Sequence, residues 1–466
     1  MLSMTLLPVP GWLLFRLRKR DAGTVLVWMC LSAVVGHPAF AQSANVAPSV
    51  GVSVAMAWAD MARYVIRYSP SNSPTYASRS LGYLGLTMYE CVVPADTLHR
   101  SLAGQLNGLP SLPPPQPGQV YHWPVVLSAG QSFLLARLYA HSTPAILSRV
   151  DSLHRAVIGG ALAAGVGTDV INRSLMQGWA VAQVIFDWSM TDGGHEAHGH
   201  RHDAHYPLPQ GPGYWVAPAK GQKGPPLPLH PYWGRNRPFV PANVLPVPAA
   251  PPYTTEPTSA CYDDFKAVFT KHKTLTAEEK AIAQWWSDDP SHSAAPAGHS
   301  YNLATTLIRL KQPDVVTAAE TYARVGMAVA DAFINCWNCK YTYHRERPST
   351  FINAHIEPGW EPFWPEPPFP AFSSGHSTQA AATATVLAAL YGDSVSFTDS
   401  THAAEPADEL TGIAYKPRRF TSLWSSAVEC ANSRFYGGIH TLTDNNVGLT
   451  EGQLIGRQVN ALRWCR

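Results

Sequence analysis

The chain has 466 residues, of which 46% are hydrophobic and only 14% charged, and its formal net charge is +2. This composition excludes an intrinsically disordered protein, because such chains combine high net charge with little apolar surface to bury. The near-neutral balance also excludes binding of nucleic acid through a strongly basic surface. The length is sufficient for one large hydrophobic core or two ordinary ones.

The first 41 residues have the pattern of a secretory signal peptide. A basic stretch at 16–20 precedes an apolar run from Thr24 to Gly36 and the small-x-small sequence Ala39-Phe40-Ala41. The run is about 13 residues long, short of the roughly 20 needed to span a bilayer. We therefore expect cleavage near Ala41–Gln42 and export to the periplasm or the medium. This segment holds four basic residues and one acidic residue, so the rest of the chain has a net charge of about −1.

Helical patterns dominate the N-terminal region, residues 42–253. Two helices are predicted between Val50 and Val93 around a turn at Ser69–Pro74, and two more over 125–139 and 144–164. Thr168 is expected to be the N-cap of the next helix. The following residues 190–252 have no periodicity and are rich in Pro, His and aromatic residues, which predicts a long ordered loop packed on the body.

Five histidines are clustered inside this loop. They are His195, His198, His200, His202 and His205. Neutral imidazoles bind Zn, Ni or Cu, but short His-rich tracts are a signal of composition only. A solvated surface loop is therefore favoured over a metal site.

The C-terminal region, residues 254–466, is also mostly helical. Thr276-x-x-Glu279 is a capping box that opens a helix through Trp285. Further helices are predicted over 314–341, 377–390, 423–434 and 445–462, with a Pro-rich loop over 348–370. No set of strands is evident, so the sequence predicts a mainly α fold, a large helical bundle with long Pro-rich loops.

Six cysteines follow the signal peptide: Cys91, Cys261, Cys336, Cys339, Cys430 and Cys465. An even number in an exported chain allows three disulfides in 15 possible pairings. Cys336-Trp-Asn-Cys339 also has the spacing of redox or metal sites. Because no second CxxC is present, structural disulfides are the favoured interpretation.

Three short segments of the last third contain the residues suited to chemistry. The first is Lys340-x6-Arg347-Pro348, the second is Ser374-Gly375-His376, and the third is Ser433-Arg434-x5-His440-x3-Asp444. Each alone is compatible with a surface charge, a turn or a helix cap. Together they fix ten identities in order and at set spacings, which chance explains poorly.

These residue types suit a tetrahedral oxyanion such as phosphate or vanadate. Two guanidinium groups and one ammonium supply charge-assisted hydrogen bonds, and a Ser-Gly turn before a helix adds donors and the positive helix end. One histidine can attack or coordinate the central atom while the other transfers a proton. Asp444, four residues after His440, can hold the far ring nitrogen of that histidine.

The three segments resemble the signature of the superfamily that joins vanadium-dependent haloperoxidases, type 2 phosphatidic acid phosphatases and bacterial acid phosphatases. The resemblance implies that Lys340, Arg347, Ser374, Gly375, His376 and Arg434 bind the oxyanion. It further implies that His440 is the axial vanadium ligand or the nucleophile and that His376 is the acid–base group. Asp289 matches an acid that pairs with Arg434 in those enzymes, and a plain acid at a helix end is the equal alternative. One position departs from the family pattern, because Ser373 stands where Pro usually precedes Ser-Gly-His. This change is expected to loosen the loop without removing a ligand.

The wider context resembles secreted bacterial relatives of the haloperoxidases, and it extends over most of the chain after the leader. The first hypothesis is therefore oxidation of halide by hydrogen peroxide at a bound vanadate. The alternative is hydrolysis of phosphate esters through a phosphohistidine at the same site, with no cofactor. A third is an exported binding protein with a vestigial pocket, which the intact set of cations and histidines argues against. Both enzymes act on small molecules. The sequence predicts no transmembrane segment after the leader and does not indicate an oligomeric state.

Overall fold

The computed structural model describes residues 49–218, 225–290 and 292–466. The expected signal peptide of residues 1–41 lies outside the described residues. The described elements belong to one compact unit, Pro48–Arg466. Among the described residues, no helix combines the length and the apolar character required to cross a membrane.

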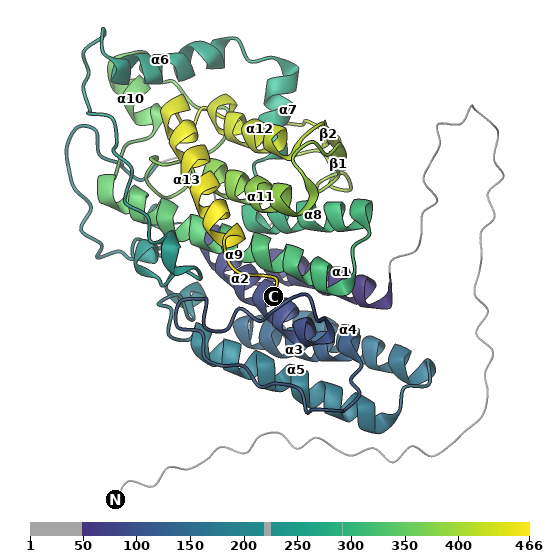
Figure 1. Cartoon of the computed structure of the whole chain (residues 1–466). Helices are drawn as coiled ribbons and strands as arrows, with labels where there is room; N and C mark the ends of the chain where they lie inside the picture. Colours follow the sequence, from purple (N-terminus) through teal and green to yellow (C-terminus); the bar gives the residue numbers. More distant parts are fainter. Residues whose placement is uncertain (1–48, 219–224, 291) are drawn as a thin grey trace, which may run out of the picture. The chain divides into compact units, whose positions relative to one another are not determined.

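The unit is built almost entirely of α-helices, which confirms the predicted fold class (Figure 1). In chain order the helices are α1 (Val50–Tyr68), α2 (Pro74–Val92), α3 (Trp123–Leu138), α4 (Pro144–Ala163), α5 (Thr168–Ser189), α6 (Ala260–Lys273), α7 (Ala277–Trp285), α8 (Ala295–Lys311), α9 (Val315–Tyr343), α10 (Pro348–His355), α11 (Gly375–Tyr391), α12 (Leu423–Tyr436) and α13 (Leu442–Asn460). Two short strands, β1 (Phe397–Asp399) and β2 (Arg418–Phe420), pair antiparallel with Phe397 opposite Phe420.

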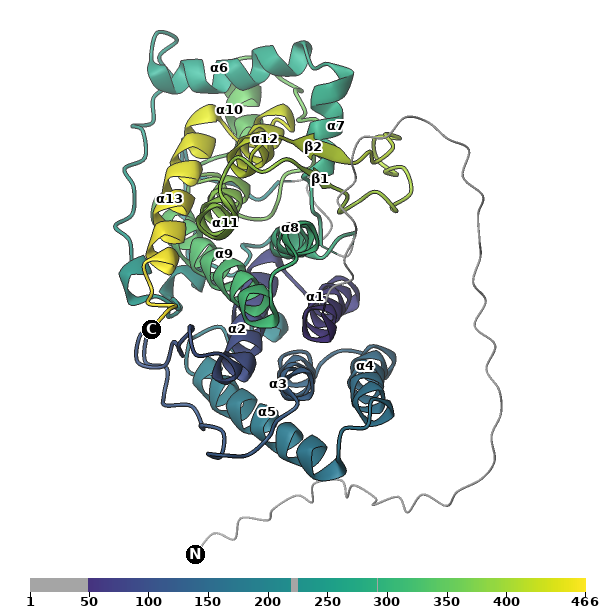
Figure 2. The same cartoon turned by 45° about the vertical axis from the view of Figure 1, so that its right-hand side comes forward.

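Helix α9 is the centre of the bundle. It begins at the predicted boundary because the Asp314 carboxylate accepts hydrogen bonds from the backbone N–H groups of Val316 and Thr317, at 2.8 and 2.9 Å. Nearly all of its 29 residues are buried, as expected for a helix covered on every side. Its partners are α2, which leads on to α3, α4 and α5, and the pair α11 and α13 (Figures 1 and 2).

Three glycines allow α13 to approach α11 very closely. Gly448, Gly452 and Gly456 recur at four-residue spacing, which places them on one face of α13. A Cβ added at Gly452 would stand 2.0 Å from the Thr378 carbonyl oxygen, and one at Gly448 would stand 2.7 Å from that of Ser374. The close packing therefore fixes the start of α13, where His440 and Asp444 lie, against the start of α11.

Several boundaries differ from the sequence predictions. Three helices, α6, α8 and α10, are additional, and α10 begins inside the expected 348–370 loop because Pro348 occupies its first turn, where proline is well tolerated. Thr168 is the first residue of α5 and Gly167 is its N-cap, so the predicted cap is wrong by one residue. The capping box of Thr276 and Glu279 is confirmed at α7.

The long excursion over 190–252 is packed on the helical body where it is described, as its aromatic content predicted. Trp215 and Trp233 are 1% and 4% exposed. The backbone N–H groups of Phe239 and Val240 donate to the buried carboxylate of Asp331 on α9, at 2.7 and 3.1 Å. Its described residues form three short 3-10 turns, η2 (Ala197–His200), η3 (Trp233–Arg235) and η4 (Pro241–Asn243).

The predicted disulfides are wrong for this structure, since the six cysteines among the described residues are free thiols. They contact different partners. The thiol of Cys261 accepts from Arg345, while those of Cys336 and Cys430 donate to the backbone of Ser373 and His376. Five of the six are buried, so they serve as small core side chains.

The glycine contact between α11 and α13 can be tested by adding a single methyl group. Gly452→Ala is expected to lower the free energy of unfolding by about 1–3 kcal/mol, the usual effect of overpacking a tight core. Urea denaturation of the full chain measures this change. The matched control is Gly159→Ala on α4, where an added Cβ meets nothing within 4 Å. That change is expected to stabilise by about 0.5–1 kcal/mol, and equal effects at both positions would contradict the packing argument.

Candidate active site

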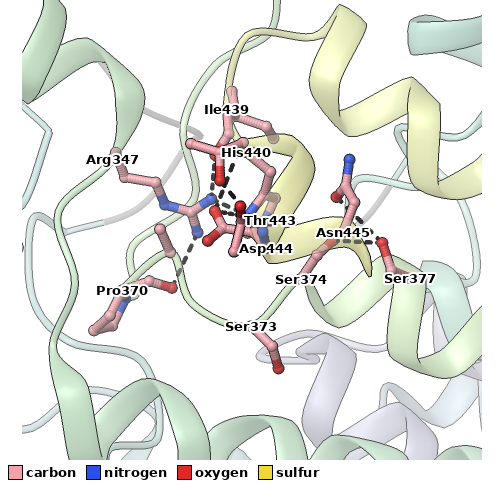
Figure 3. A network of polar contacts seen from close by, with 12 residues as sticks. Arg347, Pro370, Ser373, Ser374, Ser377, Ile439, His440, Thr443, Asp444 and Asn445 are labelled. Carbon is pink, nitrogen blue, oxygen red and sulfur yellow. Dashed lines mark hydrogen bonds and ion pairs between the residues drawn. The ribbon is translucent and has the colours of Figure 1, made fainter. Parts of the chain in front are cut away.

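The three predicted segments converge at the ends of five helices. Lys340 lies in the last turn of α9, and Arg347 is the N-cap residue of α10. Ser374 is the N-cap of α11, Arg434 lies in the last turn of α12, and His440 immediately precedes the N-cap of α13. The Ser374 backbone N–H donates to the Asp444 carbonyl at 3.1 Å, which joins the second and third segments directly (Figure 3).

Two of the three cations are bound by one stretch of backbone, the carbonyl strap of residues 369–373. The Lys340 ammonium donates to the carbonyls of Pro370, Ala371 and Ser373, at 2.9, 2.8 and 2.6 Å. The Arg347 guanidinium donates to the Phe369 carbonyl through Nε and a terminal nitrogen, at 3.2 and 2.9 Å. Both side chains are fully buried. Burial lowers the pKa of Lys340 to about 8 and that of Arg347 to about 10.

His440 is held between a carboxylate and a guanidinium. Its Nδ1 lies 3.0 Å from Asp444 Oδ2, and its Nε2 lies 3.1 Å from a terminal nitrogen of Arg347 (Figure 3). Burial and then Arg347 keep the pKa of His440 well below its usual range, so the ring is neutral. The neutral ring therefore donates from Nδ1 to Asp444 and accepts from Arg347 at Nε2.

Asp444 is positioned by the start of α13, of which it is the third residue. Its backbone N–H donates to Thr441 Oγ1, and its carboxylate accepts from the Thr441 N–H, both at 3.2 Å. This is a capping box. The predicted contact between Asp444 and His440 therefore forms, although His440 precedes the helix instead of sharing a face of it.

Five of the predicted residues line a small cavity of about 30 Å³. They are Asp289, Gly375, His376, Arg434 and His440. Phe369, Trp337 and Phe333 supply apolar walls. A second cavity of about 580 Å³ shares Pro74, Ser287, Asp289, Pro290 and Phe369 with the first, so it forms a vestibule to it. Lys340, Arg347 and Ser374 do not line the inner cavity.

His376 and Arg434 each have a buried nitrogen with no hydrogen-bond partner among the described residues, Nε2 and Nε respectively. A terminal nitrogen of Arg434 donates to the Trp286 carbonyl at 3.0 Å, and the His376 ring bonds to the backbone of Ser287. Burial followed by the charge of Arg434 holds the pKa of His376 well below its usual range. A neutral imidazole and a guanidinium N–H therefore border the same cavity.

Asp289 lies beside Arg434, as the sequence comparison with the superfamily implied. Burial raises the pKa of the Asp289 carboxyl to about 7, and the nearby Arg434 opposes this rise. The same carboxyl attracts the Arg434 guanidinium, whose pKa burial lowers. Asp289 therefore faces both cavities and the third cation.

Ser373, the departure from the family pattern, is held firmly and does not loosen the loop. Its carbonyl accepts from Lys340, and its hydroxyl donates to Glu451 Oε2 at 2.5 Å. Glu451 is buried on α13, and burial raises the pKa of its carboxyl to about 7. Glu451 was not identified from the sequence. The available signal was weak, since it consisted of the position of Glu451 eleven residues after His440.

The sequence identified Asp289 in the turn that follows α7, but not the roles of the residues beside it. The Trp286 and Ser287 backbones contact Arg434 and His376, and Asp288 forms a buried cluster with His299 and His402. These histidines lie far from any motif. The five clustered histidines of the loop, by contrast, form no group of three metal-type ligands in the described part of the chain. Of them, only His202 borders the vestibule.

Comparison with known proteins identifies the family of the chain. The family described as the VCPO second helical-bundle domain matches residues 320–463. The solved structure of a bacterial vanadium-dependent iodoperoxidase is 30% identical, with a TM-score of 0.77, and the match covers 89% of this chain and 96% of that one. No curated protein matches.

Two further structures share the fold. The holo form of a bacterial vanadium-dependent chloroperoxidase is 16% identical with a TM-score of 0.65, and the match covers 85% of this chain and 93% of that one. An apo form is 15% identical with a TM-score of 0.61, with 86% and 97% covered. The chain belongs to the vanadium-dependent haloperoxidase family.

The burial of the Glu451 carboxyl predicts how the stability of the protein depends on pH. Its pKa is about 7 in the folded chain and about 4.5 when exposed. The folded state therefore holds the proton more tightly between these values, and this stabilisation is complete below pH 4.5 and is lost as pH rises through 7. Glu451→Gln removes the titration, so the stability of the variant relative to the parent should rise by roughly 2–3 kcal/mol from pH 4.5 to 8.

Urea midpoints at several pH values measure this difference. The control is Glu256→Gln, since Glu256 is an exposed glutamate, and its stability relative to the parent should stay flat. A flat difference for Glu451→Gln as well would show that the carboxyl ionises as it does in water.

Proposed function

We propose that the protein binds vanadate in the inner cavity and uses hydrogen peroxide to oxidise a halide. One observation carries this proposal: His376 Nε2 and Arg434 Nε are buried beside neutral His440 without a partner among the described residues. A buried polar group left without a partner costs roughly 1–3 kcal/mol. A ligand with several acceptor oxygens would satisfy such groups.

The donor set fits a tetrahedral oxyanion. Arg434 offers an N–H, Gly375 opens α11 with its free backbone donors, and His440 offers Nε2 as a ligand atom. Lys340 and Arg347 add positive charge next to these groups. Because both donate to the carbonyl strap, they would bind the anion by exchanging some of those bonds for bonds to its oxygens.

Bound vanadate would supply Lewis-acid activation of hydrogen peroxide toward a halide. His376, neutral and with Nε2 on the cavity, would accept a proton from the peroxide and later return it. Asp444 would hold the Nδ1 proton of His440. The Nε2 lone pair, which accepts from Arg347 in this structure, would become available as Arg347 donates to an oxygen of the anion instead. Lys340 and Arg434 would stabilise the negative charge that develops on oxygen. The apolar walls of Phe369 and Trp337 would restrict the access of bulk water.

Iodide is the halide to test first. The solved structure of a bacterial vanadium-dependent iodoperoxidase shares 30% identity over 89% of this chain. The likeness to the chloroperoxidase structures lies at 15–16% identity, which supports only a shared fold. We therefore infer a preference for the halide that is easiest to oxidise.

The proposed activity is tested with the chain lacking residues 1–41, incubated with orthovanadate and then with peroxide and iodide. His440→Ala and His376→Ala should each lower the turnover by at least about 100-fold, since a ligand or an acid–base group is lost. His355→Ala, at an exposed histidine on α10, is the control and should retain full activity.

Hydrolysis of p-nitrophenyl phosphate without vanadate distinguishes the alternative. Hydrolysis that needs His440, together with no oxidation of iodide or bromide, would replace the haloperoxidase proposal by an acid phosphatase that uses the same pocket. Activity that survives His440→Ala in both assays would contradict the site itself.

We also propose that the protein is exported and that residues 1–41 are removed. Expression of the full chain in a bacterial host, followed by intact-mass analysis of the periplasmic and medium fractions, should show a product that begins at Gln42. A product in the membrane fraction that retains residues 1–41 would contradict cleavage.

A further inference from the structure

The turn at residues 286–289, between α7 and α8, provides backbone contacts to two site residues. The Trp286 carbonyl accepts from Arg434 at 3.0 Å, and the Ser287 backbone bonds to the ring of His376. The position of this turn therefore determines where the Arg434 guanidinium and the His376 ring lie. What holds the turn in place is consequently relevant to the site.

Asp288 anchors the turn from its centre. Its backbone is in the left-handed region, with φ of +49°, which is unfavourable for a residue with a Cβ and requires support from its surroundings. The side chain supplies that support. Oδ2 lies 2.9 Å from His299 Nδ1, and Oδ1 lies 2.9 Å from His402 Nε2. The carboxylate is fully buried.

His299 joins Asp288 to a second carboxylate. Its Nε2 lies 2.7 Å from Asp399 Oδ2, which also accepts from the indole N–H of Trp285 at 2.8 Å. The Trp286 ring stacks on the imidazole, with centroids 4.4 Å apart and planes at 11°. Both ring nitrogens of His299 therefore face carboxylate oxygens, which accept hydrogen bonds but cannot donate them when ionised. Although burial opposes the charge, the two carboxylates raise the pKa of His299 to about 10.

A metal ion is the other occupant to consider, because Asp288, His299 and His402 present ligand atoms within 4.8 Å of one another. The geometry of the three residues favours hydrogen bonds between them over a bound metal ion. Each histidine contacts its own oxygen of Asp288 at hydrogen-bond distance, and His299 uses its second nitrogen for Asp399. A single ion would draw both histidines toward one shared point instead.

We infer that His299 is a positioning residue of the active site, because its imidazolium bridges Asp288 and Asp399 and thereby fixes the turn that orients Arg434 and His376. Asp288 lines the inner cavity, whereas His299, His402 and Asp399 do not, so His299 acts through the turn. The inference rests on the proposed function, since the consequence is measured on vanadate binding and turnover.

The test substitutes His299 by Gln in the full chain and measures three quantities: the affinity for orthovanadate by calorimetry, iodide oxidation at saturating vanadate, and the melting temperature. Glutamine cannot bridge two carboxylates with positive charge. The affinity and the turnover should therefore each fall by roughly 10- to 100-fold, the effect usually seen when a partner that orients a ligand is lost.

The matched control is His154→Gln. His154 on α4 accepts or donates one hydrogen bond with Ser128 Oγ, at 3.0 Å, and has no contact with the turn. A loss of general stability would lower the melting temperature of either variant without changing the vanadate affinity of the folded protein. The positioning role requires the affinity to change in His299→Gln and to stay unchanged in His154→Gln.

The outcomes separate the inference from the proposed function. If the parent protein binds no vanadate, the proposed function fails. If the parent binds it and His299→Gln binds it equally well with equal turnover, the positioning role fails.

Should His299→Gln not fold, Asp399→Asn is measured instead. It keeps an acceptor oxygen but loses one charge, and a smaller loss of affinity in the same direction is expected, whereas unchanged affinity overturns the inference. One equivalent of metal in the purified protein, lost in His402→Gln, would also overturn it.

Discussion

The burial of three cations at one site, of which Arg434 borders the inner cavity, is the constraint on which the rest of the site depends. Removing a charged group from water costs several kcal/mol unless partners replace the lost hydration. Here Lys340 and Arg347 find those partners in backbone carbonyls of the 369–373 strap. Carbonyls satisfy the N–H donors but carry no net charge, so they do not cancel the positive charge. The pocket therefore remains attractive to an anion.

The buried cations are brought together because the ends of several helices meet at the site. Every motif residue lies at or within one turn of a helix terminus, and the lateral position of those termini is set by packing. The closest packing is that of α13 on α11, where Gly452 leaves no room for a Cβ beside the Thr378 carbonyl. As a result the Asp444 carbonyl accepts from the Ser374 N–H, and His440 faces the cavity with His376.

Most helices and motif residues could be predicted from the sequence. Where a feature depends on residues close together in the chain, the apolar periodicity and the residue types are enough to identify it. The boundaries of α9 follow from Asp314 as N-cap, and the motif spacing identified Arg434, His440 and Asp444 together. Determinants that are distant in sequence could not be found in the same way. His299 and His402 become partners of Asp288 only in the folded chain.

The sequence also could not show how the cations are distributed. Lys340, Arg347 and Arg434 look equivalent in the sequence as cationic donors in motifs, yet Arg434 alone of the three borders the inner cavity. This difference arises from the path of the Pro-rich strap, whose carbonyls point at the other two. Backbone direction in an irregular, proline-rich segment is set by tertiary contacts, such as that of Ser373 with Glu451, and not by the local sequence.

The location of the free thiols beside such a site affects their exposure to oxidants. Cys430 donates to the backbone of His376, and Cys336 donates to that of Ser373, so both lie next to a place where an oxidised halogen would be released. Oxidants attack the thiolate much faster than the thiol. Burial raises the pKa of both groups above the usual range, which keeps them protonated. The buried thiols would thus stay in the form that resists the oxidised halogen. Oxidation would begin at exposed Cys465, where it does not disturb the core.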